Sequence, residues 1–74
     1  MLEIRYEIIP KNDNFHYVCK DTTGVFVLQH KAESLGRGKE RLVFAYVAEA
    51  NSYIENNIPN PDKYTVEKIL SNIE

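Results

Sequence analysis

The 74-residue chain has little of what builds disulfides, deep cofactor clefts or membrane spans. It contains one cysteine, three glycines, three prolines and no tryptophan. The single cysteine, Cys19, excludes an internal disulfide, and no apolar run approaches the roughly 18 residues that cross a bilayer. Glu3 and Glu7 interrupt the N-terminal apolar residues, so no secretory signal is expected. These features predict a cytoplasmic protein whose thiol stays reduced.

The composition predicts one small globular domain spanning residues 1–74. Apolar residues make up 43% of the chain and charged residues 27%, as in ordinary soluble domains. A chain of this size buries only about 60% of its surface on folding, which is enough for one small core. The net charge of −2 is too mild to indicate a nucleic-acid or membrane partner on its own.

The first third of the chain predicts an antiparallel hairpin preceded by a further strand. Residues 2–9 alternate between apolar and charged side chains, which is typical of a half-buried strand. The apolar positions share one face: Leu2, Ile4, Tyr6 and Ile8. A turn cluster at 10–14 separates this strand from two more, at 15–20 and 25–30.

The hairpin between these two strands has a predicted register. Gly24 suits the left-handed position of a three-residue loop over residues 22–24. Asp21 would then oppose Val25. The remaining pairs would be Cys19 with Val27, Val18 with Leu28, and His16 with His30.

The middle of the chain allows two interpretations. Residues 31–38 read as an exposed connection. Apolar residues then recur at helical spacing and favour a helix from about residue 40 to Asn57: Val43, Tyr46, Val47, Ala50, Ile54 and Ile58. The alternative makes 42–45 a short fourth strand and starts the helix near Val47. Asn56-Asn57 followed by Ile58-Pro59 predicts the helix end.

The C-terminal segment favours a second helix over about residues 60–73. Asn60 suits a helix cap and Pro61 the first helical position. Helical spacing also links Val66, Ile69, Leu70 and Ile73. A strand remains the alternative for residues 62–73, because Tyr64 and Val66 alternate before the pattern fails at Lys68.

The predicted fold class is therefore α+β. A three-stranded antiparallel meander, with or without a short fourth strand near 42–45, packs against one or two C-terminal helices in the order β-β-β-α-α. The sheet face expected to meet the helical stripe carries Leu2, Ile4, Tyr6, Ile8, Phe15, Tyr17, Cys19, Val25 and Val27.

The opposite sheet face suggests an interaction surface. It would carry Val18, Phe26 and Leu28, whereas an exposed sheet face is normally polar. Coverage by the second helix is one explanation. The other is a partner-binding surface with His16, Lys20 and His30 as its polar rim. The sequence therefore predicts a non-catalytic module of regulator or inhibitor type that binds a protein partner or forms a homodimer.

Nucleic-acid binding is the alternative function. Four basic residues gather around the flexible connection: Lys31, Arg37, Lys39 and Arg41. A basic loop beside an aromatic sheet face can contact phosphates and stack bases. However, the pI of about 5.6 falls well below the value above roughly 9 that is typical of such modules.

No catalytic, metal or cofactor site is predicted. The Gly36-Arg37-Gly38-Lys39 segment lacks the ending of a phosphate-binding loop. Zinc needs three or four ligands, and Cys19 would point away from His16 and His30 on an alternating strand. Cys19 itself reads as a core residue rather than a nucleophile.

Overall fold

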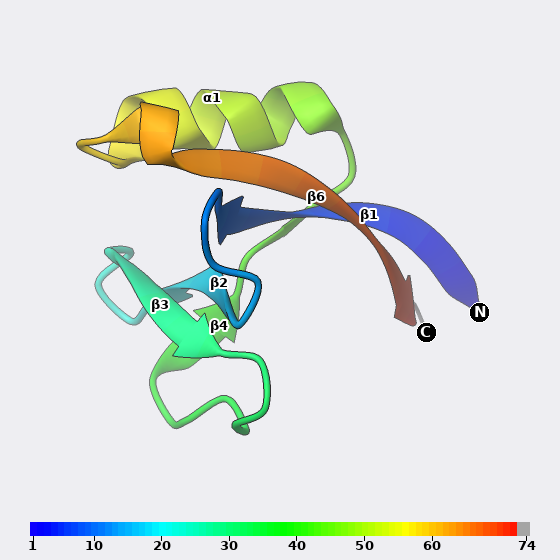
Figure 1. Ribbon diagram of the computed structural model, residues 1–74. Coiled ribbons are helices and arrows are strands. Elements are labelled where there is room, and N and C mark those ends of the chain that lie inside the picture. The colour runs from blue at the N-terminus through cyan, green and yellow to red at the C-terminus, as the bar shows by residue number, and fades with distance from the viewer. Residues whose placement is uncertain (73–74) are drawn as a thin grey trace.

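The computed structural model describes residues 1–72 and shows a mostly β fold with a single helix (Figure 1). The elements follow in this order: β1 (Leu2–Pro10), β2 (His16–Asp21), β3 (Phe26–His30), β4 (Lys39–Arg41), β5 (Val43–Phe44), α1 (Val47–Asn57), the short 3₁₀ helix η1 (Pro61–Lys63) and β6 (Tyr64–Asn72).

The strands form two three-stranded antiparallel sheets, with the orders β5-β1-β6 and β3-β2-β4. Only Leu42 separates β4 from β5. The segment 39–44 therefore pairs first with β2, where Arg41 lies opposite Cys19, and then with β1. Figure 1 shows α1 lying along β1 and β6, with the second sheet at the other end of the molecule.

The predicted three-stranded meander is wrong, because β1 does not pair with β2. It pairs instead with β6 along its whole length, from Leu2 opposite Asn72 to Pro10 opposite Tyr64. Strands β1 and β6 have nine residues each, so their backbone N–H and C=O groups can pair along the full length of both, whereas β2 has only six residues.

The predicted second helix is also wrong. Asn60 and Pro61 do begin a helical turn, but η1 ends at Lys63 and residues 64–72 form β6. Tyr64 and Val66 point into the core as alternating residues of a strand. Pairing with β1 overrides the helical spacing because strand preference depends on neighbouring strands. The prediction for Ile73 lies outside the described residues.

The alternative interpretation of the middle segment is the correct one. Val43 and Phe44 form the short strand β5, and α1 begins at Val47 rather than near residue 40. Because Val43 and Phe44 pair with β1, a helix cannot start before them. The predicted helix end is confirmed, since α1 ends at Asn57.

The hairpin of β2 and β3 has the predicted register. Val18 lies opposite Leu28, and Cys19 lies opposite Val27. Gly24 has a φ of 85°, the left-handed conformation that its loop requires. The Asp21 carboxylate accepts hydrogen bonds from the backbone N–H groups of Thr23 and Val25, at 2.9 and 3.1 Å. Local chemistry alone therefore specifies this hairpin.

The apolar interior has two clusters rather than one. The larger lies beneath α1 and contains the buried residues Ile8, Val18, Leu42, Ala50, Ile54 and Ile58. The smaller contains Ile9, Tyr17 and Cys19. The predicted core face is therefore split: Ile8 packs under the helix, whereas Tyr17 and Cys19 pack elsewhere. Because β1 and β2 belong to different sheets, their alternating faces need not coincide.

Candidate functional site

The apolar centre of the predicted partner surface lies largely inside the protein. Val18 has no exposed surface and belongs to the cluster beneath α1. Phe26 is partly buried against the same cluster, and its ring meets Tyr64 edge-on with centroids 6.2 Å apart. Leu28 alone stays open, with 45% of its surface exposed. Strand β6 and helix α1 thus cover most of the surplus apolar surface that suggested a docking face.

The polar rim predicted around that centre remains on the surface. The His16 and His30 rings meet edge-on at 5.0 Å between centroids. His16 Nδ1 lies 2.7 Å from an Asp13 carboxylate oxygen. Hydrogen bonding, first from the Phe15 backbone and then from His16, lowers the pKa of Asp13. Lys20 pairs with Glu40 at 3.7 Å. No group of three metal-ligating side chains occurs within residues 1–72.

The four basic residues of the nucleic-acid alternative are mostly engaged by the protein itself. Lys31 lies 3.5 Å from the Glu67 carboxylate, and Arg41 lies 3.0 Å from that of Glu7. Lys39 donates a hydrogen bond to the Gln29 side chain at 3.4 Å. Arg37 is exposed in the connecting loop. Lys31 and Arg41 therefore have their charges balanced by carboxylates, and phosphates would have to compete with these.

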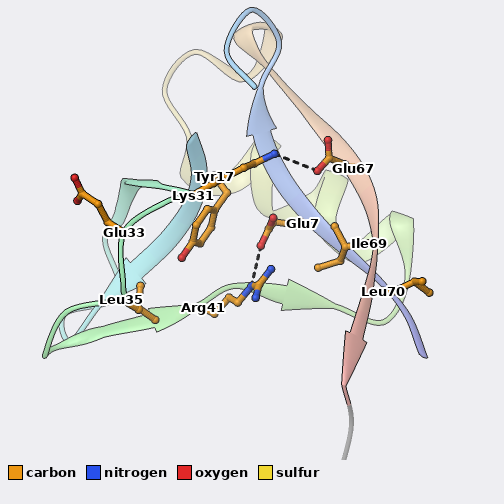
Figure 2. A pocket seen from close by; sticks show the side chains of 9 residues that line it. All are labelled: Glu7, Tyr17, Lys31, Glu33, Leu35, Arg41, Glu67, Ile69 and Leu70. Carbon is orange, nitrogen blue, oxygen red and sulfur yellow. Dashed lines mark hydrogen bonds and ion pairs between the residues drawn. The ribbon is translucent and has the colours of Figure 1, made fainter. Parts of the chain in front are cut away.

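A polar groove of about 540 Å³ lies between the two sheets (Figure 2). At its base the Glu7 side chain from β1 is only 3% exposed, and its carboxylate accepts a hydrogen bond from Arg41 Nε. The Arg41 guanidinium also lies over the Tyr17 ring, 5.5 Å from the centroid. Strands β1, β2 and β4 each contribute one of these three side chains, so only the tertiary fold assembles the group.

Two carboxylates that line the groove are paired with cations. Arg41 balances the charge of Glu7, and Lys31 balances that of Glu67. Burial is the main cause that raises the pKa of the Tyr17 hydroxyl, so this group stays a neutral phenol. Burial likewise raises the pKa of the nearby Cys19 thiol, which favours the less nucleophilic protonated form. The Arg41–Glu7 pair joins β4 of the second sheet to β1 of the first, and the Lys31–Glu67 pair joins the residue after β3 to β6.

A second feature is the apolar face of the free end of β1 and β6, which we call the β1/β6 arm (residues 2–5 and 69–72). Figure 1 shows these strands extending beyond α1 toward both termini. Three large side chains of the arm are exposed: Leu2 by 63%, Ile4 by 48% and Leu70 by 67%. Ile4 lies directly opposite Leu70, so the exposed residues form a patch.

This patch continues the face that α1 covers further along. Side chains two apart on a strand share a face, so Leu2 and Ile4 lie on the side of Ile8, which packs beneath the helix. In Figure 2, the neighbouring residues Ile69 and Leu70 lie on opposite sides of β6, with Ile69 toward Glu7, and Leu70 lies at the margin of the groove that both residues line. The other face of the arm carries Ile69 together with Arg5 and Glu3, which form an ion pair at 2.6 Å.

The sequence does not reveal the arm. Leu2, Ile4 and Ile8 follow one alternating pattern, yet Ile8 is fully buried and the other two are exposed. The difference arises because α1 is shorter than the strands it covers. Only the position of the helix along β1 could have identified these residues.

Comparisons with models of protein families, with curated proteins and with solved structures find no match for this chain. In the part of the chain that the structure describes, no helix has the length and apolar character needed to cross a membrane.

Proposed function

We propose that this chain is a non-catalytic interaction module that binds another polypeptide through the β1/β6 arm. The observation that carries the proposal is the exposed apolar face formed by Leu2, Ile4 and Leu70. Two-stranded ribbons are marginally stable without cover, and contiguous exposed apolar residues commonly mark interaction sites. The regulator or inhibitor role and the cytoplasmic location expected from the sequence stay predictions.

The edge of the arm supports the same proposal. Strand β6 is the outer strand of its sheet, and an open edge offers unpaired backbone groups to a further strand. Strand addition supplies affinity through backbone hydrogen bonds and specificity through alternate side chains. In the arm, Leu70 would provide the apolar contact beside that edge.

Two matched variants test the proposal. Ile4 and Leu28 are similarly exposed, at 48% and 45%, but Ile4 belongs to the arm and Leu28 to the surface predicted from the sequence. Ile4→Asp and Leu28→Asp would each be checked for folding by circular dichroism. Both variants and the unmodified chain would then be used to capture proteins from extract of the source cells, and calorimetry with purified captured protein would measure the affinities.

We expect Ile4→Asp to weaken binding about tenfold or more, because it buries a charge at the contact. Leu28→Asp should bind like the unmodified chain. The opposite ranking would assign the interaction to the second sheet, and equal binding by all three proteins would exclude both surfaces.

A further inference from the structure

We propose that the groove between the two sheets binds a singly charged carboxylate, carried on an apolar body, through the guanidinium of Arg41. This site is separate from the proposed contact on the β1/β6 arm. Leu70 borders both surfaces, but the polar groups that would hold the carboxylate lie on β2 and β4. Three features of the groove support the proposal: free hydrogen-bond donors, contacts that hold these donors in place, and apolar walls.

Arg41 uses only a small part of its hydrogen-bonding capacity within the protein. Its Nε–H donates to the Glu7 carboxylate at 3.0 Å. Within residues 1–72, its terminal nitrogens Nη1 and Nη2 donate no hydrogen bond. A guanidinium has about five N–H donors in one plane, so most of them stay available, and the side chain is 53% exposed to solvent.

Two contacts position the guanidinium before any ligand binds. Glu7, nearly fully buried at the base of the groove, holds Nε, and the guanidinium lies over the Tyr17 ring, 5.5 Å from its centroid. Figure 2 shows the Arg41 and Glu7 side chains pointing toward each other. An unrestrained surface arginine loses side-chain entropy when it binds an anion. Because Arg41 is already restrained, it would lose less.

The charges around Arg41 select the kind of anion. Arg41 pairs with Glu7 and Lys31 with Glu67, so each pair is formally neutral. The third lining carboxylate, that of Glu33, points away from the groove in Figure 2. The groove therefore offers oriented donors rather than excess positive charge. This favours a monoanion over phosphate, whose second charge would add repulsion from Glu7, and the planar fork of the guanidinium matches the two oxygens of a carboxylate.

The rest of the groove suits an organic acid. The Tyr17 hydroxyl has no hydrogen-bond partner within the described residues, and the burial that raises its pKa keeps it protonated, so it can donate. Leu35, Ile69 and Leu70 line the groove around these polar groups. A few placed polar groups among apolar side chains, in a volume of about 540 Å³, are typical of small-molecule sites.

NMR titration with two matched probes tests the proposal. Phenylacetate carries a carboxylate on an aromatic body, and phenylacetamide has the same body without the charge. Each would be added up to about 50 mM at constant ionic strength, because salt screens exposed ion pairs. We expect phenylacetate to shift the Arg41 Nε–H signal and the backbone signals of the lining residues saturably. Phenylacetamide should bind about tenfold more weakly or worse.

Two variants assign the binding to the guanidinium. Arg41→Lys keeps a cation beside Glu7 but removes the planar fork, so phenylacetate should bind about tenfold more weakly. Arg37→Lys is the matched control, because Arg37 is exposed in the connecting loop and does not line the groove. Its affinity should stay within about twofold of the unmodified chain. Circular dichroism would check folding. If Arg41→Lys does not fold, Tyr17→Phe removes only the hydroxyl and should weaken binding about threefold.

A third probe identifies the source of the carboxylate. N-acetylphenylalanine presents its carboxylate as the C-terminus of a polypeptide does. Tighter binding than that of phenylacetate would indicate a chain end as the ligand, and equal or weaker binding would indicate a free organic acid. Equal binding of phenylacetate and phenylacetamide would overturn the proposal. So would equal weakening by Arg41→Lys and Arg37→Lys, or the absence of saturable shifts at the lining residues.

Discussion

Glu7 illustrates how a single residue can change its role between sequence and structure. It alternates with apolar residues along β1 and so reads as a solvent-facing carboxylate. The segment containing β4 and β5 crosses this face, however, and Glu7 is only 2% exposed beside Arg41. A buried carboxylate is tolerated only when a cation or hydrogen-bond donors compensate it. The main effect of Arg41 is therefore to offset the desolvation cost of the buried Glu7 carboxylate.

We therefore expect Arg41→Ala to lower the free energy of unfolding by about 2 kcal/mol, because it leaves Glu7 buried without its partner. The half-exposed position of Arg41 places this value below that of a fully buried pair. Lys20→Ala is the control, since its partner Glu40 is 74% exposed, and it should cost about 0.5 kcal/mol or less. Urea unfolding would measure both, and equal losses would contradict the account.

Asp21 provides a second prediction at the residue scale, this time in its pH dependence. The Thr23 hydroxyl, 2.6 Å away, and the backbone N–H groups of the turn lower the pKa of Asp21 below its ordinary value of 3.8. A lowered pKa in the folded state stabilises the protein above the unfolded pKa, and this contribution is lost as the pH falls through the folded value.

Asp21→Asn should consequently unfold at a lower temperature than the unmodified chain at neutral pH, and the difference should shrink below about pH 3.8. Thermal unfolding followed by circular dichroism over a pH series would show this. A difference that stays constant down to low pH would assign the effect to the shape of the side chain rather than to its charge.

At the scale of elements, α1 lacks a side chain that caps its N-terminus. Tyr46 occupies the capping position with an extended backbone, makes no capping hydrogen bond and is 70% exposed. Packing of Ala50 and Ile54 against the core holds the helix in place instead, as expected for a helix of only 11 residues.

Tyr46→Asp should accordingly stabilise the protein by about 1 kcal/mol, because an aspartate can accept hydrogen bonds from the free N–H groups and favours the positive helix end. Tyr46→Ala removes the same ring without supplying an acceptor and serves as the control. Denaturant unfolding would compare the two, and equal stabilities would show that the cap contributes nothing.

The elements that could be predicted are those with local signals. Gly24 and Asp21 define the β2–β3 turn within a few residues, and the register followed from that turn. Strand β6 could not be predicted in the same way, because Val66, Ile69 and Leu70 fit a helical spacing, whereas the alternation expected of a strand fails at Lys68. Its conformation depends on β1, about sixty residues earlier in the chain.

At the scale of the whole molecule, two sheets share one helix, and this helix covers only part of the first sheet. The core forms where α1, β1 and the second sheet meet, while the β1/β6 arm extends beyond it (Figure 1). The candidate surface is thus a consequence of unequal element lengths rather than of a distinctive motif.

The sequence of neighbouring residues was enough to predict the N-terminal strand, the β2–β3 hairpin with Gly24, and the end of the helix near Asn57. These features depend on side chains a few residues apart, whose backbone preferences and hydrogen bonds act before any packing. The pairing of β1 with β6, the burial of Val18 and Glu7, and the exposure of Leu2, Ile4 and Leu70 depend on which distant segments meet. Burial depends on which segments pack together. For this reason Ile8, at one end of β1, lies in the core, whereas Ile4 and Leu2, which continue the same alternation, lie on the surface.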